Sequence, residues 1–253
     1  MQNKDAVYYN LGYWFLSLIV LVFAGFYYSY FSVFFQPRPT LIHIHFALMA
    51  LWVVMLIVQP FLIKYNKRKI HRLVGRISYG LVPLLLIFTY LTIRGEYDRH
   101  LGELHQQVEQ GLKTYTDAEI LKLAANAPIG IFYFVWFALF YILAIKNRRN
   151  SSVHARYMLA TALTLLGPTV DRILGINFGI ETIGGMISSY VVSFLLADMV
   201  LAILLYKDYR NGRPVKTLAT CLVIYITGQV LYYIVPGFDW WGHVMSFIMN
   251  PVP

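Results

Sequence analysis

The chain turns back on itself at Lys64-Tyr-Asn-Lys-Arg-Lys-Ile-His71-Arg72, a basic stretch that separates two long apolar runs. A second basic stretch of the same kind reads Lys146-Asn-Arg-Arg-Asn-Ser-Ser-Val-His154-Ala-Arg156. Loops rich in lysine and arginine stay on the cytoplasmic side of a membrane. The two stretches therefore predict the topology of the chain, and they place His71 and His154 on the same side of the membrane.

Composition is typical of an integral membrane protein. The 253 residues are 58% hydrophobic and only 13% charged, and the mean hydropathy is +0.59, whereas soluble domains carry roughly 25% charged residues. Since a helix needs about 20 apolar residues to cross a bilayer, the chain has room for about seven spans in one transmembrane domain, residues 1–253. The net charge of +9 lies in short loops, which favours contact with anionic lipid headgroups over nucleic-acid binding.

Seven apolar runs are expected to cross the bilayer as α-helices: 13–35, 41–63, 77–93, 129–145, 158–174, 183–206 and 218–235. With both basic stretches inside, fifteen of the 21 lysine and arginine residues fall on the cytoplasmic side. This bias predicts a cytoplasmic N-terminus and an external C-terminus, and it fits a bacterial inner membrane protein. The single cysteine, Cys221, excludes an intramolecular disulfide.

Two segments are expected outside the membrane. Residues 94–127 form the longer one, an external amphipathic insertion in which Thr116-Asp-Ala-Glu119 reads as a capping box that opens a short helix. Residues 236–253 form an external tail, and its adjacent tryptophans, Trp240 and Trp241, favour the level of the lipid headgroups.

The two basic stretches also suggest a cofactor site. The runs 41–63 and 77–93 form one hairpin, and 129–145 and 158–174 form a second. If these hairpins pack as the halves of a four-helix core, His71 and His154 face each other at the same depth. Two facing imidazoles can ligate a b-type haem, with Arg72, Arg76 or Arg156 pairing with its propionates. The alternatives are that both histidines simply belong to topology-setting turns, or that the site binds an anion or a lipid headgroup.

A second group of histidines lies at the opposite side of the membrane. His43 and His45 are two residues apart near the start of a helix, so they differ by about 200° of rotation and cannot point at one ion together. His45 is the inward candidate, and with Asp171 it predicts a site for a divalent metal ion. The alternative is ordinary polar capping of helix ends.

Asp198 is an acid deep within an apolar run, about 13 Å from the cytoplasmic end of its helix. An acidic side chain at this depth is costly and marks a partner, a proton path or a ligand. Gln229, Gln59 and Arg156 are the candidate partners.

The segments His71-Arg-Leu-Val-Gly75-Arg76 and His154-Ala-Arg-Tyr157-Met158 carry a resemblance that covers residues 41–206. The chain resembles a family of uncharacterised bacterial polytopic membrane proteins with a domain of unknown function and H-R-x-x-G-R and H-x-x-[WY]-M segments. The resemblance implies a histidine early in the second helix and an acid late in the sixth, here Asp198, but it implies no chemistry. The long external segment has no clear counterpart in that family.

These patterns predict a haem- or metal-binding membrane redox protein with a histidine-based site, and so a membrane oxidoreductase. The alternative is a protein for proton-, anion- or lipid-linked transport or binding that uses Asp198 and the basic turns. A metal-dependent membrane hydrolase is disfavoured because the run 218–235 contains no histidine.

Overall fold

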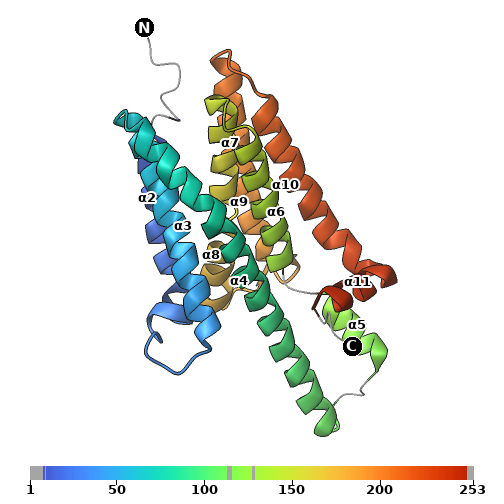
Figure 1. The fold of residues 1–253 in the computed structure, drawn as a ribbon. Helices are drawn as coiled ribbons and strands as arrows, with labels where there is room; N and C mark the ends of the chain where they lie inside the picture. The colour runs from blue at the N-terminus through green and yellow to red at the C-terminus, as the bar shows by residue number, and fades with distance from the viewer. Residues whose placement is uncertain (1–7, 9, 113–115, 127–128, 250–253) are drawn as a thin grey trace.

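The computed structural model describes Tyr8 and residues 10–112, 116–126 and 129–249 (Figure 1). Lys4 and Lys113, which are counted among the 21 lysine and arginine residues that predict the orientation, lie outside these residues. The described chain is almost entirely helical, as predicted. Its elements are α2 (Leu11–Phe26), α3 (Thr40–Lys64), α4 (Arg68–Glu109), α5 (Asp117–Ala125), α6 (Gly130–Lys146), α7 (Ser151–Leu163), α8 (Leu166–Arg172), β1 (Thr182–Ile183), β2 (Ile187–Ser188), α9 (Tyr190–Arg210), α10 (Lys216–Ile234) and α11 (Asp239–Met249).

The predicted membrane bundle is confirmed. Six helices of the described chain are long and apolar enough to cross a bilayer, and the number rises to seven if the bent pair α5 and α6 is one span. Figure 1 shows the turns α3–α4, α6–α7 and α9–α10 at one end of the bundle, and α5 and α11 at the other end. The basic turns therefore share one side of the molecule, in keeping with the expected orientation.

The helix α4 is longer than the sequence suggested. The apolar run ends at Ile93, but the helix continues to Glu109 and has 42 residues, or about 63 Å. Arg99 bonds to both Glu96 and Glu103 along the extension, and pairs at this spacing stabilise an exposed helix. The external insertion thus begins as a continuous extension of a membrane helix.

The segment between α7 and α9 departs most from expectation. The expected span 158–174 falls within one longer span, Ser151–Asn177, in which the α-helix is interrupted between Leu163 and Leu166 and α8 continues as a π-helix, Ile173–Asn177. The expected span 183–206 begins too early, because Thr182–Ile183 pairs with Ile187–Ser188 in an antiparallel hairpin. Gly184 and Gly185 both have positive φ in its turn, a conformation that glycine adopts without strain.

The two segments expected outside the membrane, residues 94–127 and 236–253, pack against each other. Thr116 caps α5 by accepting a hydrogen bond from the Glu119 amide at 3.2 Å, so the predicted cap is confirmed. The expected interfacial tail is helical between Asp239 and Met249, and α11 lies against α5. Trp241 Nε1 donates to the Ala125 oxygen at 3.0 Å, which fixes α11 on α5.

The main core lies at the centre of the bundle. Its fully buried large side chains come from α3, α4, α6, α9 and α10 and include Trp52, Leu85, Phe140, Leu201 and Tyr225. Around them, apolar side chains such as Ile77, Leu195 and Val223 point outward and are exposed. A helical bundle with an apolar outer surface is the arrangement that lipid solvates.

Candidate functional site

The hairpins α3–α4 and α6–α7 enclose a cavity at the end of the bundle that carries the basic turns. Its volume is about 1080 Å³, at the upper end of the range for small-molecule and cofactor sites, roughly 300–1,000 Å³. Lys64 and Trp52 both line it, twelve residues apart on α3, so the cavity reaches about 18 Å along the bundle. Residue Tyr8, before α2, and residues of α2 complete the wall.

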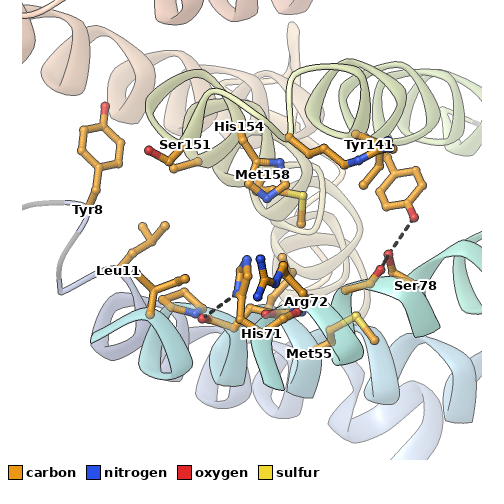
Figure 2. A pocket seen from close by; sticks show the side chains of 18 of the residues that line it. Tyr8, Leu11, Met55, His71, Arg72, Ser78, Tyr141, Ser151, His154 and Met158 are labelled. Carbon is orange, nitrogen blue, oxygen red and sulfur yellow. Dashed lines mark hydrogen bonds between the residues drawn. The ribbon is translucent and has the colours of Figure 1, made fainter. Parts of the chain in front are cut away.

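His71 and His154 project into this cavity from opposite walls, and Figure 2 shows their rings pointing toward each other. His71 lies in the first turn of α4 and His154 in the first turn of α7. The structure therefore brings together the two histidines that the hairpin argument paired. Both imidazoles are half-buried.

Each imidazole is oriented by a bond from its Nδ1 atom. His71 Nδ1 lies 3.4 Å from the Gln59 backbone oxygen, and His154 Nδ1 lies 2.9 Å from the Ala144 backbone oxygen. A carbonyl oxygen only accepts, so the nitrogen that faces it carries the proton. The Nε2 atom of each neutral ring keeps its lone pair, and this tautomer is the one that binds a metal through Nε2.

Gln59 holds the His71 end of the cavity together. Its amide Nε2 donates to the His71 backbone oxygen at 3.2 Å, while its own backbone oxygen faces the imidazole. These two bonds tie the last turns of α3 to the first turn of α4. The sequence suggested Gln59 as a partner of Asp198, but the structure places it against His71.

The mouth of the cavity is strongly basic. Five exposed cations line it, and their side chains form no hydrogen bond or ion pair with other described residues; we call them the basic rim: Lys69, Arg72, Arg76, Arg148 and Arg149. Lys64 and Arg156 also line the cavity, and the described lining contains no aspartate or glutamate. An anionic group at the mouth would therefore be attracted to the rim without competition from a carboxylate of the lining.

Arg156 is occupied by a partner that the sequence analysis missed. Its Nε and Nη2 atoms bond to Asp208 Oδ2 at 2.9 and 2.6 Å, and Nη1 bonds to the backbone oxygen of Ser152 at 2.9 Å. Both charged side chains are 2% exposed. The expected role of Arg156 as a propionate or Asp198 partner is therefore not supported, because its donors are already used.

Two further residues complete this network around Asp208. Tyr8 donates to Asp208 Oδ2 at 2.9 Å, and Arg213 Nη1 lies 3.4 Å from Oδ1. Burial raises the pKa of the Tyr8 phenol, so the hydroxyl stays protonated and donates. The network joins the segment before α2 to α7 and α9. Asp208 escaped notice in the sequence because it lies between Lys207 and Tyr209 in an apparently basic turn.

The expected external metal site is not assembled. His43 Nδ1 lies 3.0 Å from Tyr30 Oη, whereas His45 Nδ1 lies 3.5 Å from Thr89 Oγ1 on a different helix. Asp171 accepts from the Tyr133 hydroxyl at 2.9 Å. Nowhere in the described chain do three His, Cys, Asp or Glu side chains lie close enough to hold a metal ion. The rotation of His43 against His45 explains their separation.

Asp198 has the partner that the sequence suggested. Gln229 Nε2 on α10 donates to Asp198 Oδ1 on α9 at 3.1 Å. Neither residue lines the cavity. The bond gives one carboxylate oxygen of Asp198 a hydrogen-bond donor and links α9 to α10. Hydrogen bonds of this kind join neighbouring helices in membranes.

No known protein family, curated protein or solved structure matches this chain. The likeness to the uncharacterised membrane family stays a prediction. The cavity is the feature that points to a function.

Proposed function

We propose that this protein is a membrane haem protein that carries electrons, with a b-type haem bound between His71 and His154. One observation carries the proposal: two imidazoles with Nδ1 held by backbone carbonyls face each other across one cavity. The Nε2 atoms are then the ligands offered to the iron. Facing helices supply axial ligands in this way in helical-bundle haem proteins.

The rest of the cavity suits the remainder of a haem. A porphyrin has a planar apolar body and two propionates at one edge. The walls offer Phe15, Met55 and Ile145 to the ring, and Arg72 and Arg149 of the basic rim are free to pair with the carboxylates as bidentate donors. The apolar interior and the basic mouth thus match the two ends of one molecule.

The number of ligands indicates the activity. With His71 and His154 both holding the iron, a bound haem would keep no open position for oxygen or a substrate. The chemistry it would supply is electron exchange with a partner. The proposed activity is therefore electron transfer within the membrane, and the oxidoreductase to which it belongs includes that partner.

The test is an absorbance spectrum of detergent-purified protein from haem-replete cells, with haem identified after extraction into alkaline pyridine. We expect a Soret band that is lost in His71→Ala and in His154→Ala, because each variant removes one axial ligand. His243→Ala is the matched control, since His243 is exposed on α11, far from the cavity. A colourless parent protein with an intact helical spectrum and a single gel-filtration peak would overturn the proposal.

A second function rests on the same charge distribution. An anionic lipid also combines an apolar body with a negative head, and the basic rim with its carboxylate-free lining suits that head as well. Mass spectrometry of the lipids that copurify separates the two cases. A stoichiometric anionic lipid, lost from the double variant Arg72→Gln with Arg149→Gln in a protein without haem, would favour a lipid-binding or transport protein.

A further inference from the structure

Asp198 and Gln229 form a polar pair in the groove between α9 and α10. Gln229 Nε2 donates to Asp198 Oδ1, whereas Asp198 Oδ2 and the Gln229 side-chain oxygen have no hydrogen-bond partner in the described chain. Neither of these two oxygens is buried, and both residues are half-buried. Each residue therefore keeps one polar atom open to whatever surrounds the bundle.

The neighbours of the pair show that this groove faces outward. The residues three or four positions from Asp198 or Gln229 along the open side of each helix are all exposed: Leu195, Ala202, Ile226 and Tyr233. Residues at this spacing lie on one face of a helix. The pair thus lies within a largely apolar outer face of the bundle.

The depth of the pair makes an uncovered carboxyl costly. The helix α9 runs from Tyr190 to Arg210, so at least eight residues, about 12 Å of helix, separate Asp198 from either end. Lipid tails offer no hydrogen-bond partner at this depth. Ionisable residues of membrane helices usually face the bundle interior or a water-filled cavity, but Asp198 does not line the cavity. The groove therefore points to a covering protein surface that supplies polar partners.

The pair is complementary to a second copy of itself. A carboxyl in hydrocarbon takes its neutral form, and since Oδ1 accepts from Gln229, the proton belongs on Oδ2. The pair then presents one donor, the Asp198 hydroxyl, and one acceptor, the Gln229 oxygen. Around a two-fold axis along the membrane normal, the donor of each copy meets the acceptor of the other. A cationic side chain from another protein would also fit Asp198, but it would bring a charge into the hydrocarbon.

We propose that the α9–α10 groove is the interface of a homodimer within the membrane, in which Asp198 of each copy donates to Gln229 of the other. Polar side chains join helices in this way in membranes, and a small residue beside them, here Ala202, allows the helices to approach closely. The inference does not rest on the haem, because neither Asp198 nor Gln229 lines the cavity.

The experiment measures energy transfer between donor- and acceptor-labelled copies of the full-length protein in vesicles of phosphatidylcholine and phosphatidylglycerol. We expect transfer to rise with the protein-to-lipid ratio, as a dimer requires. Asp198→Leu should weaken the dimer roughly tenfold, because it removes both symmetric hydrogen bonds, and Gln229→Leu should do the same. Asp198→Asn should dimerise like the parent, since an amide also donates to the Gln229 oxygen.

Thr227→Leu is the matched control. Thr227 is exposed on α10, but it is two residues from Gln229 and so points about 200° away from the groove. Its dimer should be as tight as that of the parent. A parent that stays monomeric at every protein-to-lipid ratio would overturn the inference, and so would equal dimer affinity in the parent, Asp198→Leu and Gln229→Leu.

Cross-linking in native membranes identifies the occupant of the groove. In a Cys221→Ser background, Ala202→Cys should give a dimer with a short bismaleimide. Ile77→Cys, which is exposed on α4 and a similar number of residues from the basic end of its helix, should not. Cross-linking of Ala202→Cys only to a different polypeptide would assign the groove to another protein and overturn the homodimer.

Thermal unfolding of each variant in detergent identifies any that fail to fold. If Asp198→Leu is one of them, Gln229→Leu and the cross-linking decide the question.

Discussion

At the scale of single residues, the most consequential interaction is the buried pair of Arg156 and Asp208. Removing two charges from water is expensive, and their attraction offsets this cost only when the remaining donors are satisfied. Here Ser152 takes the third nitrogen of Arg156, and Tyr8 and Arg213 approach Asp208. The pair thus fixes the wall of the cavity next to His154.

Asp208→Ala should destabilise the protein by about 3–5 kcal/mol, because it leaves a buried guanidinium without its partner. Thermal unfolding followed by circular dichroism in detergent measures the loss. The double variant Arg156→Met with Asp208→Leu should recover part of it, since the buried guanidinium of Arg156 is removed as well, although Arg213, 11% exposed, loses its contact with Asp208.

Arg99→Ala provides the comparison for this prediction. Its partners Glu96 and Glu103 are exposed, so the variant should cost no more than about 1 kcal/mol. If Asp208→Ala and Arg99→Ala unfolded at the same temperature, the buried pair would contribute no more to stability than the exposed one, and the prediction would be wrong.

At the scale of elements, the helices α2 and α8 approach each other through a glycine. A Cβ atom added to Gly25 would lie 2.7 Å from the Thr169 oxygen and 3.0 Å from its Cα atom. The obstacle is backbone, so it cannot rotate away as a flexible side chain would. Small residues allow such close packing between helices in membranes.

Gly25→Ala should therefore separate α2 from α8 and lower stability by about 1–3 kcal/mol, the usual cost of overpacking. Gly80→Ala on α4 is the control, because an added Cβ there meets nothing within 4 Å. Alanine favours a helix more than glycine does, so the control should unfold at the same or a slightly higher temperature than the parent.

How far the sequence predicts these elements depends on what defines each one. Apolar length locates the helices of the bundle, and the repeated basic turns pair His71 with His154. Apolar length does not mark where a helix ends, so it misses the polar extension of α4 and the hairpin before α9. Asp208 could not be identified either, because its significance depends on residues distant in sequence, Arg156 and Tyr8.

At the scale of the whole molecule, charge is distributed unequally between the two ends. The turns α3–α4 and α6–α7 carry the five cations of the basic rim, while the extension of α4 at the other end carries two arginines, Arg94 and Arg99, each paired with an acidic side chain. This asymmetry should orient the protein in the bilayer with the rim in the cytoplasm.

Cysteine labelling of intact cells checks this orientation. In a Cys221→Ser background, Gln110→Cys at the end of α4 should react with a membrane-impermeant maleimide. Lys67→Cys, in the α3–α4 turn, should react only after the membrane is opened with detergent. Both positions are exposed. The opposite labelling pattern would reverse the assigned orientation.

The position of the cavity mouth has a consequence for how the protein matures. Arg72 and Arg149 lie at the end of the bundle that the predicted orientation places in the cytoplasm, and Trp52 lies at the far end of the cavity within the bundle. A cofactor made in the cytoplasm would reach His71 and His154 without crossing the bilayer. Assembly of the holoprotein would then depend on supply from that compartment and on no export machinery.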